Sequence, residues 1–355
     1  MQLSYEQEAA VKAKESKVVV VASAGSGKTA TVTERIRYLL SIGENPNTIF
    51  AITFTNNAAQ EMKERLSDLK EINDVFIGTI HSLANKILIK NGIKTTEAIE
   101  NQDFDELFYL IKTKPIQLPL VNHLLIDEFQ DINREFYEFY FKSLKPNNFF
   151  AVGDCRQAIY AFSGGSLEWM NRTLNDCDTA IYELNTCYRC PKNIIKFANK
   201  FIAGDPDVYF TSTESNLEDL GTIVTEGFSN NDLVDNVSMI GDYKNWFILC
   251  RTNQQVKDIL ELLGKNNIPA ETFKKAGNSL EDLNKKINNN TVKVLTIHSA
   301  KGLEAEHVAV VGARTFNSEE KRICYVAATR AKRDLFWYKN MPNKPKAKNM
   351  QWGFC

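Results

Sequence analysis

Residues 18–29 decide the fold class, and they read Val-Val-Val-Val-Ala-Ser-Ala-Gly-Ser-Gly-Lys-Thr. The four valines are typical of a strand that is buried on both faces of a parallel sheet. A glycine-bearing turn follows at once, and an amphipathic run then extends to Leu40. Strand, turn, Lys-Thr and helix in this order predict a P-loop, whose backbone N–H groups cradle phosphates. The strict motif has glycine where this chain has Ala22, so a glycine turn that binds nothing is the alternative interpretation.

The polar residues of this motif suit a nucleoside triphosphate with Mg²⁺. Lys28 is expected to reach the β- and γ-phosphates, and the Thr29 hydroxyl is expected to meet the metal ion. The residues predicted to form the phosphate cradle are Ala24, Gly25, Ser26 and Gly27.

Two further strands are predicted to end in polar groups beside the P-loop. Residues 123–126 are apolar and lead into Asp127 and Glu128. Parallel sheets place their sites at the carboxyl ends of strands, so one acid is expected to hold Mg²⁺ and the other to orient or deprotonate water. A solvated helix start is the alternative. The strand over residues 148–154 leads to Gln157, which suggests a sensor of the γ-phosphate or, alternatively, a polar turn residue.

Composition places the chain among soluble globular proteins. Its 355 residues include 43 Lys+Arg and 44 Asp+Glu, a formal net charge of −1, with 43% hydrophobic residues. These values exclude a largely disordered, collagen-like or membrane-spanning chain, and the N-terminus is too polar for a secretory signal. The nearly neutral total charge does not indicate nucleic-acid binding, but a local basic groove is compatible with this total. The length suggests two or three domains.

The cysteines indicate reduced, intracellular thiols rather than a disulfide framework. Seven cysteines are widely scattered, and only Cys187 and Cys190 form a C-x-x-C pair. A structural zinc site usually needs a second pair at similar spacing, and the sequence has none. We therefore do not expect a zinc site.

Nine short blocks follow one another along nearly the whole chain. They are residues 3–7 (LSxxQ), 24–29 (AGSGKT), 53–62 (TFTNNAAxEM), 78–82 (GTIHS), 127–131 (DEFQD), 152–160 (VGDxxQxIY), 184–189 (LNxxYR), 296–304 (TIHSAKGLE) and 325–331 (YVAATRA). In this order they resemble the UvrD/Rep/PcrA-type branch of superfamily 1 DNA helicases. Departures from the family pattern include Ala30, where an arginine is usual, and Ser163, which removes a charged contact.

The resemblance implies an α/β fold with two RecA-like parallel-sheet lobes around a P-loop NTPase core that binds ATP and Mg²⁺. It implies that Gln7 bonds the adenine edge, Tyr188 stacks on its face and Glu304 contacts the ribose. Arg189 and Arg330 resemble the two arginine fingers that neutralise charge on the γ-phosphate, worth about 10³–10⁵ in rate in other NTPases. An ordinary surface position is the alternative for each arginine.

The resemblance also implies a surface for single-stranded DNA. Aromatic side chains stack on bases of any sequence, and the candidates are Phe54, Tyr160 and Phe162. Polar contacts to the DNA backbone or sugar are implied for Thr55, Asn56, Thr79, His81 and His298. Burial in a core is the alternative for the aromatic residues, and a satisfied polar group at a strand end is the alternative for the histidines.

The blocks divide the chain into two predicted lobes, residues 1–180 and 181–340. Ligands of one ATP on both lobes would make the cleft a hinge, closed by ATP and released by hydrolysis. Large relatives carry a helical accessory domain in each lobe. Here the corresponding insertions, about 85–122 and about 271–290, are too short for independent cores, although two short helices are expected at 85–90 and 104–114. The basic tail, residues 341–355, is expected to be solvated, or alternatively to dock DNA or a partner.

These features predict an ATP-dependent DNA helicase that translocates on single-stranded DNA, with a 3′→5′ direction taken from the resemblance. One alternative is a DNA-dependent ATPase that displaces proteins without separating strands. Another is a non-catalytic, ATP-gated DNA-binding subunit, which need not keep Lys28, Glu128 and both arginines. The expected partners are single-stranded and tailed duplex DNA and a single-strand-binding, replication or repair protein, with a monomer as the motor unit and no membrane. The cytoplasm near the nucleoid is the expected location, and a phage-infected host cell would also suit the small size.

Overall fold

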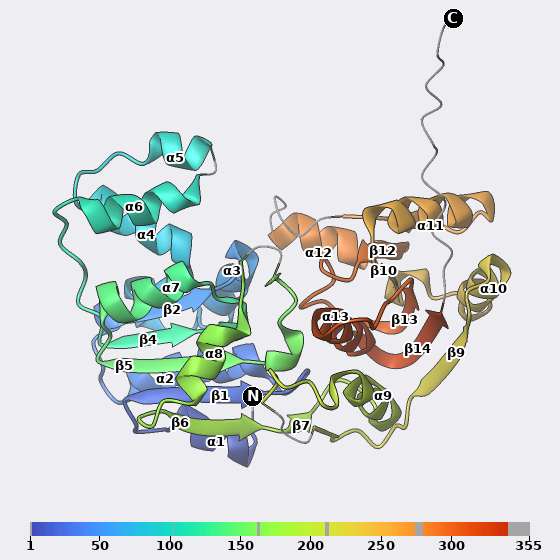
Figure 1. Cartoon of the computed structure of the whole chain (residues 1–355), viewed down its shortest axis with the longest axis horizontal. Helices are drawn as coiled ribbons and strands as arrows, with labels where there is room; N and C mark the ends of the chain where they lie inside the picture. Colours follow the sequence, from blue (N-terminus) through green and yellow to red (C-terminus); the bar gives the residue numbers. More distant parts are fainter. Residues whose placement is uncertain (1, 102, 162–163, 210–212, 274–279, 340–355) are drawn as a thin grey trace, which may run out of the picture.

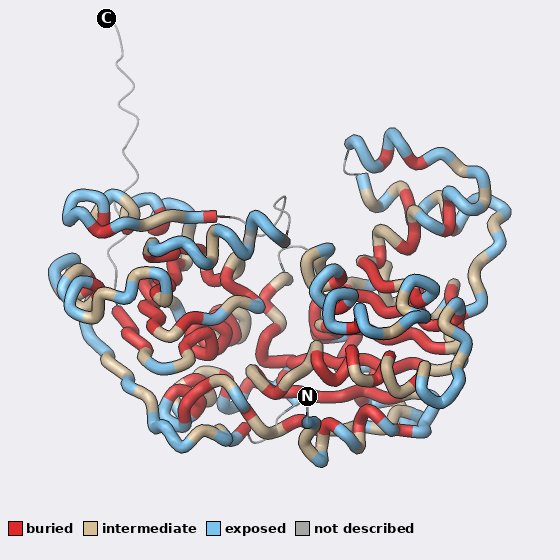
Figure 2. Tube along the Cα trace, turned by 180° about the vertical axis from the view of Figure 1, so that it is seen from behind, coloured by how far each residue is buried: buried red, intermediate tan, exposed pale blue. Residues whose placement is uncertain are grey.

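The chain forms two α/β lobes that lie side by side (Figure 1). The computed structural model describes residues 2–101, 103–161, 164–209, 213–273 and 280–339. Each lobe is built on one six-stranded sheet. In both sheets the central strands are buried, whereas edge strands are partly exposed, and most exposed residues lie on the outer helices (Figure 2). No helix in these ranges is long and apolar enough to cross a membrane.

The first sheet is entirely parallel, in the order β3-β2-β4-β5-β1-β6. Side chains of β1 alternate between two cores: Val18 and Val20 pack on one face, and Val19 and Val21 pack on the other. The prediction of a strand buried on both faces is therefore confirmed. The strands are β1 (Lys17–Ala22), β2 (Ile49–Thr53), β3 (Phe76–Thr79), β4 (His123–Ile126), β5 (Asn148–Gly153) and β6 (Ala180–Leu184).

The second sheet is also parallel throughout, in the order β11-β12-β10-β13-β14-β9. Its strands are β9 (Thr222–Gly227), β10 (Trp246–Cys250), β11 (Ala270–Glu271), β12 (Val292–Thr296), β13 (Ala305–Val311) and β14 (Ala331–Lys339). A short parallel pair, β7 (Thr186–Cys187) with β8 (Glu214–Ser215), lies in the connection between the two large sheets. The predicted parallel α/β fold class is confirmed.

Helices cover both faces of each sheet, as the parallel connections require. Those of the first lobe are α1 (Tyr5–Val11), α2 (Lys28–Ser41), α3 (Asn56–Arg65), α4 (Ile80–Lys90), α5 (Thr96–Glu100), α6 (Phe104–Thr113), α7 (Arg134–Glu138) and α8 (Leu167–Leu174). Those that follow are α9 (Lys192–Ile202), α10 (Asn230–Ile240), α11 (Asn253–Lys265), α12 (Leu280–Asn288) and α13 (Ser318–Ala328).

Strand order brings the three sequence signals to one edge of the first sheet. β1 lies next to β5, and β5 lies next to β4. The P-loop, Asp154 and Asp127 therefore follow three neighbouring strands at their carboxyl ends, where parallel sheets hold their ligands.

The first insertion shares the core of its lobe. Helices α5 and α6 project beyond the sheet in Figure 1, at the upper left. Yet Leu107, Phe108 and Ile111 of α6 belong to the same apolar cluster as Val19 of β1. Two helices were expected here, and the structure has a third, α5, between them. Within the described residues, the second insertion contributes α12 alone between β11 and β12.

The predicted lobe boundary at residue 180 falls inside the first sheet and is corrected by the strand pairing. Ala180 pairs with Val18 and Leu184 pairs with Ala22. The first sheet therefore extends to Leu184, because β6 supplies its edge strand next to β1. Beyond it, an apolar cluster joins the lobes: Ala24 and Ile159 pack with residues of α9, α13 and the second sheet.

Candidate functional site

Two glycines let the P-loop turn tightly between β1 and α2. Gly25 and Gly27 have φ angles of 73° and 83°, in the left-handed region that glycine adopts without strain. Gln7 from α1 packs on the turn, and its Nε2 donates a hydrogen bond to the Ser26 carbonyl at 2.9 Å. A Cβ at position 27 would lie 2.6 Å from that nitrogen. A side chain at this position would therefore displace the Gln7 amide, and the positive φ would strain the backbone of any other residue.

Lys28 and Thr29 begin α2 and face the acids that follow β4. Thr29 Oγ1 donates a hydrogen bond to Asp127 Oδ2 at 2.8 Å. Burial lowers the pKa of Lys28, and the Glu128 carboxylate is foremost among the charges that oppose this shift. The hydroxyl and the carboxylate form an oxygen pair of the kind that Mg²⁺ accepts.

The two acids differ in their electrostatic surroundings. Burial and the neighbouring Glu128 raise the pKa of Asp127 to about 6. Burial alone would raise the pKa of Glu128 as well, but the ammonium groups of Lys301 and Lys28 outweigh it and lower this pKa to about 2. Glu128 also has a φ angle of 58°, a conformation that costs non-glycine residues about 1–3 kcal/mol and that concentrates at functional sites.

Arg330 reaches from the second lobe into the first. Its side chain is buried, Nε donates to the Val326 carbonyl at 3.0 Å, and Nη2 donates to Gln157 Oε1 at 3.3 Å. Burial and the nearby Arg189 lower the pKa of Arg330 to about 9. The predicted sensor Gln157 and the predicted finger Arg330 are thus direct neighbours across the cleft.

Arg189 has two guanidinium nitrogens that are ready for a ligand. Nη1 lies 3.6 Å from Glu304 Oε2. Nε and Nη2 are buried and have no hydrogen-bond partner among the described residues. Buried donors left unpaired are costly, so their presence indicates an absent acceptor. With the P-loop and Lys28 close by, phosphate oxygens fit that requirement, and the residues present fit ATP with Mg²⁺ held by Thr29 and Asp127.

Lys301 of the second lobe contacts several residues of the first lobe, and these contacts were not predicted from the sequence. It is buried, and its Nζ pairs with Asp131 Oδ2 and donates to the Gln157 carbonyl at 2.9 Å. The same Nζ lies 4.0 Å from Glu128 Oε2 and 4.7 Å from the centre of the Tyr160 ring. Lys301 and Asp131 belong to two of the nine sequence blocks, but no role was predicted for either. Both stand among other polar and charged residues in the sequence, so nothing there marked them as a pair.

The residues predicted to contact adenine and ribose lie around the P-loop, and they differ in whether their side chains already have partners. Gln7 Oε1 accepts a hydrogen bond from the Ser4 N–H at 2.9 Å, so its amide already serves the capping of α1. Tyr188 is 42% exposed, and its N–H donates to the Gly25 carbonyl at 3.0 Å. Its ring is therefore held near the P-loop and open to a ligand, whereas Glu304 is exposed and paired with Arg189.

Three of the rings predicted for DNA lie together at the cleft. Phe54 stacks on Tyr160 with ring centres 5.1 Å apart, and His298 of the second lobe lies 6.4 Å beyond Tyr160. Phe54 is 42% exposed, which is unusual for a core phenylalanine. Burial lowers the pKa of His298, which favours the neutral ring. Phe162 lies outside the described residues.

A cavity of about 470 Å³ opens beside Phe54 and extends to the acids. Its lining includes Thr79, His81, Phe104 and Glu128. His81 stacks on Phe104 at 4.5 Å, and burial lowers its pKa. The structure therefore places His81 in an aromatic cluster at the wall of this cavity, a position compatible with both the DNA role and the core alternative.

The remaining polar candidates sit at helix starts. Thr55 caps α3 by accepting from the Ala58 N–H at 3.2 Å, and Thr79 caps α4 by accepting from the Ser82 N–H at 3.2 Å. Asn56 is the first residue of α3 and is exposed. These caps account for the hydroxyls structurally, and the helix starts present N–H groups that suit phosphate.

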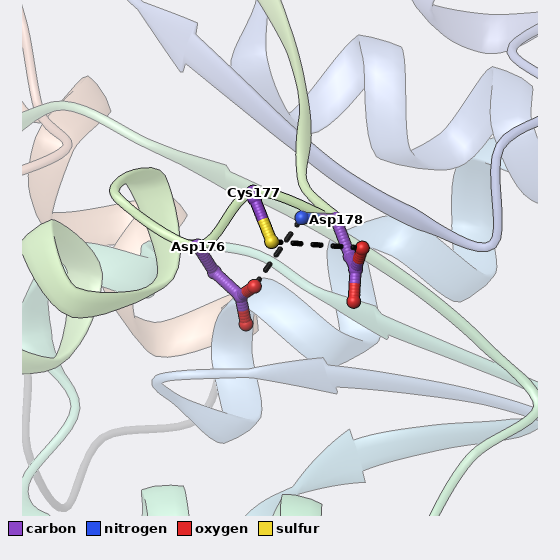
Figure 3. Close-up of side chains that lie close together, drawn as sticks. All are labelled: Asp176, Cys177 and Asp178. Atoms are coloured by element: carbon purple, nitrogen blue, oxygen red, sulfur yellow. Dashed lines mark hydrogen bonds between the residues drawn. The ribbon is translucent and has the colours of Figure 1, made fainter.

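Potential metal ligands outside this cleft gather at one surface turn of the described chain. Asp176, Cys177 and Asp178 lie close together between α8 and β6 (Figure 3). The Asp178 N–H donates to Asp176 Oδ1 at 3.3 Å, which is an ordinary turn bond. The other oxygen of Asp176 pairs with Lys17 Nζ at 2.5 Å, so a lysine already neutralises this carboxylate.

Fold and site together define a P-loop NTPase with two RecA-like lobes. Family comparison then resolves the class further. The model of the UvrD/REP helicase N-terminal domain matches residues 3–118 and 100–178, and that of the UvrD-like helicase C-terminal domain matches residues 274–340. The chain belongs to the UvrD/Rep helicase family, as its sequence blocks predicted.

Curated relatives agree with this assignment. A "Probable DNA helicase" of Mycoplasma pneumoniae is 27% identical over 452 residues, covering 94% of this chain and 82% of the relative. The ATP-dependent DNA helicase Rep of Buchnera aphidicola is 27% identical over 76% of this chain and 56% of its own length. PcrA of Staphylococcus epidermidis is 25% identical over 75% of this chain and 50% of its own. The chain thus spans about half the length of Rep and PcrA.

Proposed function

We propose that this chain is an ATP-driven motor that translocates on single-stranded DNA and separates DNA strands. The observation that carries this proposal is the meeting of both lobes at one phosphate site. Arg189 offers two buried, unpaired nitrogens there, and Arg330 hydrogen-bonds Gln157 of the first lobe. The relatives named as DNA helicases support the same conclusion.

The hydrolytic roles follow from the side chains. Lys28 would bind the β- and γ-phosphates, and Thr29 and Asp127 would hold Mg²⁺, which when bound neutralises phosphate charge. Glu128, ionised because its pKa is low, would orient the attacking water and accept its proton. Arg189 and Arg330 would stabilise charge that develops on the γ-phosphate.

Coupling to DNA would use the contacts that cross the cleft. Tyr160 and Phe54 would stack on bases from the first lobe, and His298 would contact the strand from the second. Lys301 lies between this ring pair and the acids, so closure of the lobes would change both sites together. Alternating grips on each lobe would turn each hydrolysis cycle into a step.

We infer the 3′→5′ direction from the family resemblance. A single motor unit is expected to be a monomer on single-stranded or tailed duplex DNA. A DNA substrate would place its work at the nucleoid of a bacterial or phage-infected cell, with single-strand-binding, replication or repair proteins as partners. A non-catalytic role is disfavoured because Lys28, Glu128 and both arginines are retained in one cleft.

A strand-displacement assay tests the proposal. Purified protein with ATP and Mg²⁺ is mixed with duplexes that carry a 3′ tail, a 5′ tail or no tail. We expect release of the labelled strand from the 3′-tailed duplex only.

Glu128→Gln should bind ATP but release no labelled strand, because an amide cannot accept a proton. Glu218→Gln, an exposed acid, is the matched control. ATP hydrolysis without strand release on any duplex would favour the translocating ATPase, and preference for a 5′ tail would overturn the direction.

A further inference from the structure

The C-x-x-C pair lies on the segment that crosses between the lobes. Residues 185–191 connect β6 of the first sheet to α9, which packs on α13 of the second lobe. Cys187 and Cys190 are both fully buried in the apolar cluster that joins the lobes. Zinc binding was disfavoured from the sequence, and the proposed hydrolysis leaves both thiols without a task.

The two thiols are arranged as neighbours. The Cys190 N–H donates to Cys187 Sγ at 3.3 Å. The neighbouring Cys190 side chain is the main reason why the pKa of Cys187 is lowered to about 6, while the pKa of Cys190 is raised. One reactive thiolate beside one protonated thiol is the pattern of dithiols that form and break a disulfide.

Both sulfurs touch the ATP machinery. A Cβ added to Gly25 of the P-loop would lie 2.9 Å from Cys187 Sγ and 2.7 Å from Arg189 Cβ, so both residues pack closely against this glycine. On the other side, Cys190 Sγ donates to the Thr329 carbonyl at 3.3 Å, next to the finger Arg330. Arg189 itself lies between the two cysteines in sequence.

We propose that Cys187 and Cys190 are a thiol modification site that a low-molecular-weight disulfide oxidises to an internal disulfide, switching the ATP site off. The inference rests on the proposed function. Cys187 thiolate attacks one sulfur of glutathione disulfide, forming a mixed disulfide and releasing one glutathione thiolate. Cys190, after losing its proton, attacks the Cys187 sulfur, closes the internal disulfide and releases the second glutathione. Two protein thiols are oxidised, and one glutathione disulfide is reduced to two thiols.

Loss of activity follows from the contacts that the disulfide would replace. Cys190 would lose the proton that it donates to the Thr329 carbonyl, and the two sulfurs would move toward each other, because an S–S bond is only about 2.05 Å long. Arg189, carried by the same short segment, would move with them. Since both thiols are buried at the joint between the lobes, oxidation needs the lobes to separate. Bound nucleotide should therefore slow it.

The test treats the reduced, full-length chain with glutathione disulfide and follows two readouts separately. Mass spectrometry of the protein and its peptides reports a Cys187–Cys190 bond or a glutathione adduct. ATP hydrolysis is measured before treatment, after it, and after reduction with dithiothreitol. We expect the internal disulfide, at least a tenfold loss of turnover, and full recovery on reduction. A non-hydrolysable ATP analogue with Mg²⁺ should slow disulfide formation.

Variants separate the site from general thiol damage. Cys177→Ser, which removes an exposed cysteine, should behave as wild type. Cys190→Ser should trap glutathione on Cys187, whereas Cys187→Ser and Cys187→Ala should form neither product and stay insensitive. If peptide mapping finds no bond between the two residues, the modification site is wrong. If the bond forms while turnover is unchanged, the switch is wrong. Absence of ATP hydrolysis in the reduced wild type would instead contradict the proposed function, and mapping would still decide the site.

Discussion

Substitution of Arg189 and Arg330 tests the proposed hydrolytic roles most directly at the residue scale. Arg330 comes from the second lobe and Arg189 from the segment that joins the lobes, whereas the P-loop and acids come from the first. Arg189→Ala and Arg330→Ala should each lower kcat by at least about tenfold with little change in KM for ATP, because the contact is made mainly in the transition state. Steady-state ATP hydrolysis in the presence of single-stranded DNA measures both constants.

Arg333→Ala is the matched control, since that side chain is 66% exposed on the same lobe. Thermal unfolding should accompany the assay, because Arg330 also bonds the Val326 and Leu303 carbonyls and its loss can weaken the fold. If either variant keeps the wild-type kcat, that arginine has no catalytic role, and the site belongs to one lobe.

Site residues that belong to a recognisable motif could be predicted from the sequence. Thr29 and Asp127 are far apart in sequence, yet their predicted proximity is a 2.8 Å hydrogen bond. The ion pair between Lys301 and Asp131 was not predicted, because a buried contact between lobes depends on how the two sheets pack against each other. Such a distance is not encoded in local periodicity or spacing.

At the scale of elements, the ring pair of Phe54 and Tyr160 makes the clearest prediction. Phe54 follows β2 and Tyr160 follows β5, so two loops of one sheet edge supply the stack. Phe54→Ala should weaken binding of single-stranded DNA of any sequence by about 1–3 kcal/mol, the usual contribution of one stacked base. Fluorescence anisotropy with labelled oligonucleotides at several salt concentrations measures this.

Tyr5→Ala controls for the loss of an exposed ring, because Tyr5 is 87% exposed on α1. Affinity should also fall with rising salt for both proteins, since phosphate contacts release counterions. Equal affinity of Phe54→Ala and wild type for DNA would mean that Phe54 does not stack on bases and has only a structural role.

Elements with strong periodicity were predicted well, and short or edge elements were not. The buried strands β1, β4 and β5 lie within a residue or two of their expected positions. β6 and α5 were not placed: β6 is a half-exposed edge strand, and α5 has only five residues. Their positions come from pairing with β1 and packing on α6, which are tertiary contacts.

At the scale of the whole molecule, the short insertions lead to a prediction about how far the proposed motor unwinds DNA. The alignment with the Mycoplasma relative is longer than this chain, so that relative has residues without a counterpart here. Helix α6 packs into the core of the first lobe and forms no separate body. We therefore expect translocation to be efficient and unwinding by one monomer to be short, because each base-pair step holds about 1.4 kcal/mol of stacking.

Single-turnover unwinding of duplexes of increasing length behind a 3′ tail, with a trap for free enzyme, measures this. Strand release should fall steeply with duplex length. It should recover when several monomers load on a longer tail, or when a protein that traps the freed strand is added. Full unwinding of long duplexes by single monomers would mean that the small insertions suffice.

The central claim is that DNA bound across two lobes governs hydrolysis at one shared ATP site. Steady-state ATP hydrolysis with and without single-stranded DNA tests it most directly. Because closure brings Arg189 and Arg330 to the phosphates, we expect DNA to raise kcat by at least about tenfold, a change of about 1.4 kcal/mol in activation free energy. The same kcat with and without DNA, in protein shown to bind both ATP and the oligonucleotide, would contradict the account.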